Sequence, residues 1–356
     1  MTRCEPIRDG AWWYSGVLTQ EECEELQRLS VEQGMADYRA DERLRVMERV
    51  EIDVPELAAT VWQRISPLIP ERVVVDGSDD SRRIGLPADD PNLHGVWRPL
   101  GLNPYLRVAK YPGNGRGHFG PHRDGAYEVS LTERSLLTLN GYLAEVPEGC
   151  GGRTRFLVDG LELHQDEATG RFVVKDEAAA VTHSVRPQAG CAIVFYHGLM
   201  HDGEPLREGA PPKWIFRFDI MFRREGPAPS PLALTARRLE TEADGLEREQ
   251  PMLSMELSRL ALKLREGRVK VEEAQARGAA LLGRQRLLEG AVDTDVWKPA
   301  PEEAEEAEAE AEAAEEVELH PAPQAALDPS AFIGRPVKEL DAAMRRYLAG
   351  EPWTVG

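Results

Sequence analysis

Between residues 105 and 222 the chain is a succession of short apolar and β-branched runs that only a β-rich fold can accommodate. Clusters of Gly, Pro and Asn separate the runs, which read YLRVAKY, SLLTLNGYLAEV, GRFVVKD, CAIVFY and KWIFRFDIMF. Many short strands without intervening helices are typical of a β-barrel or a β-sandwich. The last run alternates strictly, with an apolar face that begins at Trp214 and an opposite face, Lys213, Ile215, Arg217, Asp219 and Met221, that is unusually polar for a core strand.

Helices are expected on both sides of this β-rich region. Residues 18–34 form a predicted helix, because Thr19 and Glu22 have the spacing of a capping box and Gly34 supplies a stop. A second helix is predicted over residues 53–66, with Asp53 and Pro55 at its start. After a Pro-rich hinge, charge-dense helical sequence continues to about residue 292 and is interrupted at Pro251.

These changes in composition and sequence pattern predict five segments. Residues 1–100 form a helical, supporting layer, residues 101–225 the barrel core, and residues 226–293 a helical extension. Residues 294–330 form an acidic low-complexity linker that cannot bury an apolar face, and residues 331–356 a C-terminal helix.

The charge of the chain is unevenly distributed. The formal net charge is -19, but residues 302–318 hold ten glutamates and no basic residue, so the rest of the chain carries only about -9. We expect no nucleic-acid partner; the acidic tail either recruits a basic partner or simply keeps the protein in solution. The four cysteines lack framework spacing, and no secretion signal or membrane-spanning run is apparent, so we expect reduced thiols and a cytoplasmic protein.

Two histidines and one aspartate have the pattern of a metal site. His122 and Asp124 lie two residues apart in GHFGPHRDGAY, so their side chains leave the same face if the segment is extended. His201, in VFYHGLMHDGEP, follows a strand-like run, and a barrel can bring it to the same place. Two imidazoles and one carboxylate on one side of a metal form the facial triad of non-haem iron(II) oxygenases, which leaves open positions for other ligands.

The order of several motifs resembles a known family. RVAKYPGNGRGHFGPHRDGAY, SLLTLNGYLAEVPEGCGGRTRF, VRPQAGCAIVFYHGLMHDGEP and KWIFRFDIM occur in sequence between residues 102 and 223. Together they are similar to the prolyl 4-hydroxylase-type catalytic domain of the iron(II)/2-oxoglutarate dioxygenases. The resemblance implies a double-stranded β-helix, that is, a jelly-roll barrel with flanking helices, here followed by a C-terminal helical extension.

The resemblance also implies chemistry and cofactors. It implies that His122, Asp124 and His201 hold iron(II), and that 2-oxoglutarate is the cosubstrate, dioxygen the oxidant and ascorbate the reductant. It also implies that a substrate is hydroxylated while succinate and carbon dioxide are released. A cation is needed for the distal carboxylate of 2-oxoglutarate. Lys213 fits best, and Arg217, on the same strand face, is the second candidate. Tyr142 and Tyr111 match positions that line the 2-oxoglutarate pocket in the family.

The substrate is less constrained than the cofactors. The segment that precedes the triad in the sequence contains four candidates for the substrate rim: Trp97, Arg98, Asn103 and Arg107. A packed Trp with surface arginines explains these residues equally well. A prolyl side chain, another protein side chain and a free small molecule all remain open, because the shared motifs bind iron and 2-oxoglutarate rather than the group that is hydroxylated.

Two other functions are compatible with parts of this pattern. The same barrel could be a non-catalytic metal-binding module that acts through its helical and acidic C-terminal region. A zinc hydrolase also uses two histidines and a carboxylate, but the chain lacks an HExxH helix.

Overall fold

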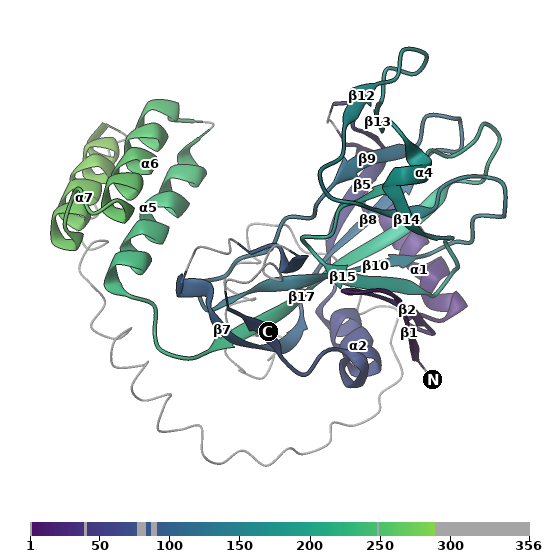
Figure 1. The fold of residues 1–356 in the computed structure, drawn as a ribbon, viewed down its shortest axis with the longest axis horizontal. Coiled ribbons are helices and arrows are strands. Elements are labelled where there is room, and N and C mark those ends of the chain that lie inside the picture. The colour runs from purple at the N-terminus through teal and green to yellow at the C-terminus, as the bar shows by residue number, and fades with distance from the viewer. Residues whose placement is uncertain (1, 39–40, 77–82, 87–90, 248, 289–356) are drawn as a thin grey trace. The chain divides into compact units, whose positions relative to one another are not determined.

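The computed structural model describes residues 2–38, 41–76, 83–86, 91–247 and 249–288 (Figure 1). The chain divides into two compact units, one that runs to Glu225 and one that begins at Gly226, and each is described by itself. The acidic linker expected at residues 294–330 and the C-terminal helix expected at residues 331–356 lie outside the described residues.

The first unit is built from two antiparallel sheets that lie face to face (Figure 1). The larger sheet has ten strands, in the spatial order β1 (Arg3–Arg8), β2 (Ala11–Ser15), β15 (Ala192–Tyr196), β10 (Glu133–Tyr142), β17 (Lys213–Glu225), β8 (Tyr105–Tyr111), β5 (Glu48–Asp53) and β3 (Ala36–Asp37), with β7 (Gly95–Leu102) also paired to β17 and β6 (Val73–Val75) paired to β7. The smaller sheet has the order β14 (Val181–Val185), β11 (Thr154–Leu157), β16 (His201–Gly203), β9 (His118–His122) and β4 (Arg45–Val46). A hairpin, β12 (Leu163–Gln165) and β13 (Phe172–Val174), stands apart from both sheets.

The core lies between the two sheets. Phe156 of β11 and Phe195 of β15 meet there edge to face, with ring centroids 5.4 Å apart, and both side chains are almost completely buried. The short strands thus form two packed sheets, and the mainly β, jelly-roll fold that the resemblance implied is confirmed. One end of the space between the sheets stays open and carries polar side chains, which is why the polar face of β17 does not lie in an apolar core.

Two helices support the larger sheet. Helix α1 (Gln20–Glu32) begins where the capping box predicted, since the Thr19 hydroxyl accepts from the Glu22 amide and the Glu22 carboxylate accepts from the Thr19 amide. Helix α2 (Pro55–Ile65) has Pro55 in its first turn, but its N-cap is Val54, without a side-chain cap, rather than Asp53. Three shorter helical segments complete the unit: η1 (Ser66–Leu68), η2 (Pro91–Leu93) and α4 (Glu177–Ala180).

The first hundred residues contribute more strand than the sequence indicated. Besides α1 and α2, they supply β1 to β6 and much of β7, and β5 pairs with β8 along six residues. These strands gave little signal because β3 and β4 have two residues each and β5 reads ERVEID, which is largely polar. The supporting layer is therefore a helical and β layer, and β4 and β5 border the site described below.

The second unit is a set of three helices, α5 (Pro231–Leu246), α6 (Pro251–Arg265) and α7 (Val271–Leu288). They share a small apolar core that includes Leu239, Leu257 and Leu264. Pro251 lies at the first turn of α6, as expected of the predicted break. A second break, at Gly267 with a φ of 69°, was not anticipated. The predicted C-terminal helical extension is confirmed.

Two general expectations can be compared with this structure. All four cysteines are free thiols, two of them buried. Within the described residues, no helix combines the length and the apolar character that crossing a bilayer requires.

Candidate metal centre and cosubstrate pocket

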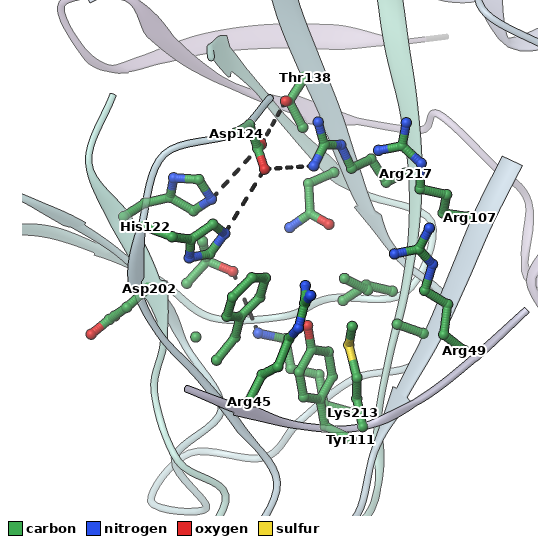
Figure 2. Close-up of a pocket in the computed structure, with 18 of the residues that line it drawn as sticks. Arg45, Arg49, Arg107, Tyr111, His122, Asp124, Thr138, Asp202, Lys213 and Arg217 are labelled. Atoms are coloured by element: carbon green, nitrogen blue, oxygen red, sulfur yellow. Dashed lines mark hydrogen bonds and ion pairs between the residues drawn. The ribbon is translucent and has the colours of Figure 1, made fainter. Parts of the chain in front are cut away.

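His122 and His201 face each other across two paired strands of the smaller sheet. They are direct register partners on β9 and β16. Asp124 follows β9, and its backbone amide donates to the carbonyl of His197 at 3.1 Å, which turns its side chain toward both imidazoles. One potential ligand atom from each of His122, Asp124 and His201 lies within 4.8 Å of the other two. Figure 2 shows His122 and Asp124 side by side at this place. The structure therefore brings together the three residues that the sequence pattern selected.

Both imidazoles are oriented by the backbone. Nδ1 of His122 lies 2.8 Å from the Gly120 carbonyl, and Nδ1 of His201 lies 3.0 Å from the Leu199 carbonyl. Because a carbonyl can only accept, each Nδ1 carries a hydrogen, which leaves Nε2 as the nitrogen that can bind a metal. Burial and the neighbouring His201 lower the pKa of His122 to about 3, so this imidazole is neutral at physiological pH and ready to bind a metal.

Asp124 is held by two further side chains. Its Oδ1 accepts from Nη1 of Arg217 at 2.5 Å, and its Oδ2 accepts from the Thr138 hydroxyl at 2.6 Å. Burial alone raises the pKa of this carboxyl, but Arg217 and the two histidines outweigh it and hold the pKa well below its usual range. Asp124 is thus an ionised carboxylate beside two imidazoles, a donor set that suits a divalent cation.

A cavity of about 220 Å³ extends from this cluster between the two sheets (Figure 2). Lys213, at the start of β17, lines it and is only 4% exposed. Its Nζ lies 3.5 Å from the Thr154 hydroxyl and above the rings of Tyr111 and Tyr142, at 5.5 and 5.9 Å from the ring centroids. Burial lowers the pKa of Lys213 to about 8, although Asp202 and Glu204 act in the opposite direction. In the described part of the chain, no carboxylate oxygen lies within ion-pair distance of this ammonium.

Arg217 has a different environment, although it lies on the same face of β17 as Lys213. Its guanidinium donates to Asp124 and, at 2.9 Å, to the buried Asp219. Two carboxylates therefore already neutralise Arg217, whereas Lys213 offers an uncompensated charge to the cavity.

The sequence of this part of the chain matches a family model. Residues 106–218 match the model of the 2OG-Fe(II) oxygenase superfamily. The matched segment contains His122, Asp124 and His201, together with Lys213 and Arg217.

Several solved structures are similar to this chain at low identity. A viral collagen prolyl hydroxylase from Paramecium bursaria Chlorella virus-1 has 16% identity and a TM-score of 0.36, and the match covers 60% of this chain and 96% of that one. A prolyl-4-hydroxylase from Pseudomonas putida has 17% identity and a TM-score of 0.35, with 61% and 94% covered. EvdO2 from Micromonospora carbonacea var. aurantiaca has 15% identity and a TM-score of 0.36, with 62% and 90% covered. No curated protein matches the chain.

Three of the four residues expected at the substrate rim do not line the cavity. Trp97 is fully buried and donates to the Leu93 carbonyl at 2.9 Å, Arg98 pairs with Glu225 at 2.5 Å, and Asn103 caps the turn before Tyr105. Trp97 and Arg98 belong to β7, which pairs with the far half of β17 beyond the site, and Asn103 follows this strand directly. Arg107 does line the cavity, where it pairs with Asp219 at 2.8 Å.

The structure adds cavity residues that the sequence gave no reason to select. Arg45 on β4 and Arg49 on β5 enter from the N-terminal layer (Figure 2). Asn140 of β10 also lines the cavity. Thr138 holds Asp124 and also lies 2.9 Å from Nδ1 of the buried His197. The sequence could not select the arginines because their positions depend on strand pairing. Arg45, for example, lies opposite Phe119 because of the register between β4 and β9.

Proposed function

We propose that this protein is an iron(II)- and 2-oxoglutarate-dependent dioxygenase that hydroxylates an organic substrate and releases succinate and carbon dioxide. The proposal is carried by one observation: the ligand atoms of His122, Asp124 and His201 converge within 4.8 Å beside the buried, uncompensated ammonium of Lys213. A metal site alone would fit several functions. A metal site next to a buried cation fits a cosubstrate that both chelates the metal and ends in a carboxylate.

The residues present fit iron(II). Two imidazole nitrogens and one ionised carboxylate form the donor set preferred by non-haem iron, and they leave other positions free. When bound, iron(II) and 2-oxoglutarate supply the oxidation of a substrate C–H bond by dioxygen. His122 and His201 present their Nε2 atoms, while Arg217 and Thr138 fix the Asp124 carboxylate and keep it ionised.

Lys213 is the residue that we assign to the distal carboxylate of 2-oxoglutarate. A buried carboxylate without a partner is costly, and Lys213 is the cation that matches it. Burial raises the pKa of Tyr111 and Tyr142 far above the usual value, so both phenols keep their hydrogen. Tyr142 donates to Thr154 at 2.9 Å, and the Thr154 hydroxyl is also next to Lys213, so these hydroxyls complete the polar end of the pocket. Arg217 is assigned to the metal side instead.

The substrate class follows less directly. A prolyl or other amino-acid side chain and a free small molecule are both candidates, because the site residues assigned above bind the metal and the cosubstrate rather than the group that reacts.

The first test is 2-oxoglutarate turnover without a substrate. Metal-stripped protein is incubated in air with iron(II), ascorbate as reductant and 2-oxoglutarate, and succinate is measured. We expect slow succinate formation that requires iron(II) and is not supported by zinc. His122→Ala should abolish both metal binding and turnover, whereas His118→Ala is a matched control, because His118 lies on the same strand but is bonded to backbone carbonyls away from the metal cluster.

Binding separates an inactive enzyme from a different function. If no succinate forms, the visible absorption of an iron(II)–2-oxoglutarate chelate is sought under anaerobic conditions. Chelate formation would mean that turnover awaits the substrate. Failure of the folded, iron-loaded protein to bind 2-oxoglutarate would refute the proposal and favour a non-catalytic metal-binding module.

A further inference from the structure

The cavity is markedly cationic although the whole chain is acidic. Six cationic side chains line it: Arg45, Arg49, Arg107, Arg123, Lys213 and Arg217. Four of them are paired with carboxylates, in the pairs Arg49–Glu51, Arg107–Asp219, Arg123–Asp159 and Arg217–Asp124. Among the described residues, Arg45 and Lys213 are the lining cations without a carboxylate partner.

The cosubstrate accounts for one of these two charges. 2-Oxoglutarate has two carboxylates, of which one would chelate the metal together with the keto oxygen and the other would meet Lys213 under the function proposed above. Arg45 is then left with an uncompensated positive charge on the cavity wall.

Arg45 is held in a defined orientation next to the metal cluster. Its guanidinium carbon lies 4.1 Å from the centre of the Tyr38 ring and 5.1 Å from that of Phe119. Phe119 in turn stacks on the imidazole of His122, with centroids 3.5 Å apart and planes 12° apart. The Nε of Arg45 is buried and has no hydrogen-bond partner. Two aromatic faces thus position a guanidinium whose donors are not satisfied by the protein.

A second unsatisfied group lies on another wall of the same cavity. Asn140 is 9% exposed, and its Oδ1 is buried without a hydrogen-bond partner. It comes from β10, in register with Arg217 on β17, whereas Arg45 comes from the smaller sheet. A buried acceptor and a buried donor group that lack partners are costly unless a ligand satisfies them. Both groups are therefore available to a polar ligand of this cavity.

We propose that Arg45 binds a carboxylate of the substrate, so that the hydroxylated compound is an organic acid or contains an acidic side chain. This inference rests on the proposed function. Arg49 is already paired with Glu51, so this part of the cavity has one uncompensated positive charge, which matches a singly charged carboxylate better than a phosphate dianion. The planar guanidinium can bind a carboxylate through two parallel hydrogen bonds, which would also orient the substrate near His122.

The test compares acids with their amides. The full chain is loaded with manganese(II), which does not support turnover, and saturated with 2-oxoglutarate. Calorimetry then measures binding of N-acetyl amino acids and their primary amides, and of blocked peptides that contain Asp or Glu and their Asn or Gln counterparts. We expect at least one acid to bind at least about tenfold more tightly than its amide, the usual size of a charge-assisted hydrogen-bond effect. Free acids and peptides form separate arms, so the preferred arm identifies the source of the carboxylate.

Two variants test whether Arg45 causes the preference for the acid. Arg45→Met should remove the preference for the acid, and Arg45→Lys should restore part of it because the charge remains. Arg116→Met is the matched control, since Arg116 is an exposed arginine that pairs with Glu42 and does not line the cavity.

Three results would overturn the inference. One is the absence of any acid preference in the wild-type protein that binds 2-oxoglutarate normally. Another is loss of 2-oxoglutarate affinity in Arg45→Met, which would place Arg45 in the cosubstrate site. The third is an acid preference that persists in Arg45→Met. If the wild-type protein does not bind 2-oxoglutarate at all, the proposed function fails instead, and the same acid and amide pairs on the manganese-loaded protein still test Arg45.

Discussion

Arg217 donates a hydrogen bond of 2.5 Å to Asp124, a residue that precedes it by 93 positions, and it also donates to Asp219 at 2.9 Å. The three side chains form a carboxylate–guanidinium–carboxylate chain in which two members are almost completely inaccessible. Asp219 also accepts from Arg107, so the arrangement is anchored on both β17 and β8. Its consequence is that Asp124 remains ionised in a buried place where a lone carboxyl would hold its proton.

Arg217→Met should therefore weaken metal binding. Without the guanidinium, the pKa of Asp124 rises and the carboxylate loses its orientation, so we expect manganese(II) affinity to fall by about 10- to 100-fold, the range known for groups that orient metal ligands. Paramagnetic resonance of free manganese measures this directly. Arg107→Met is the matched control, because Arg107 pairs with Asp219 but not with Asp124. Equal effects of the two substitutions would contradict a specific role of Arg217.

Lys213→Met should lower cosubstrate affinity and raise stability at the same time. The methionine cannot pair with a carboxylate, so 2-oxoglutarate should bind at least about tenfold more weakly. The free protein should gain about 1–3 kcal/mol in its free energy of unfolding at pH 7, because an ammonium that is costly to bury has been removed. Calorimetry and urea denaturation measure the two quantities. A variant that loses both affinity and stability would show that Lys213 is a structural residue.

The affinity for 2-oxoglutarate should also depend on pH in the wild-type protein. Lys213 has a pKa of about 8, so it is charged below this pH and loses its proton above it. Binding should be constant between about pH 6.5 and 7.5 and should weaken above pH 8, by up to about tenfold per pH unit. In Lys213→Met this dependence should disappear.

The free energy of unfolding should also depend on pH through Lys213. The folded-state pKa of Lys213 lies below its unfolded value of about 10.4, so the unfolded chain binds more protons between these limits. The stability of the wild-type protein should therefore approach that of Lys213→Met as the pH rises from 8 toward 10. A 2-oxoglutarate affinity that does not change with pH in the wild-type protein would refute Lys213 as its partner.

The first unit should retain the site without the helical extension. We propose that the chain can be ended at Glu225, because every residue assigned to metal and cosubstrate lies before it and the three helices have an apolar core of their own. A fragment of residues 1–225 should bind manganese(II) and 2-oxoglutarate within about twofold of the full chain, as measured by calorimetry. A folded fragment that has lost either ligand would show that the extension contributes to the site.

Local patterns carried much of the reasoning about the site. The capping box at Thr19 and Glu22 and the alternation in β17 are each contained in a few consecutive residues, and the structure shows both. The His122–Asp124 pair is equally local, and the structure brings it close to His201. The rim was the part that failed, because Trp97 precedes the triad closely along the chain but belongs to a strand that pairs beyond it.

By itself, the sequence determined that a β-rich body would present two histidines and an aspartate, because strand alternation and a two-residue spacing act within one segment. It favoured Lys213 over Arg217 only through the resemblance, because both residues leave the same strand on the same face. The structure adds that Asp124 and Asp219 pair with Arg217 and not with Lys213, which supports our proposal for Lys213. Nor could it find Arg45, whose place beside Phe119 depends on the register of two strands more than seventy residues apart. The role of a charged side chain depends on the groups that lie next to it. Pairing between strands that are distant in the sequence brings these groups together, so only the tertiary structure decides which they are.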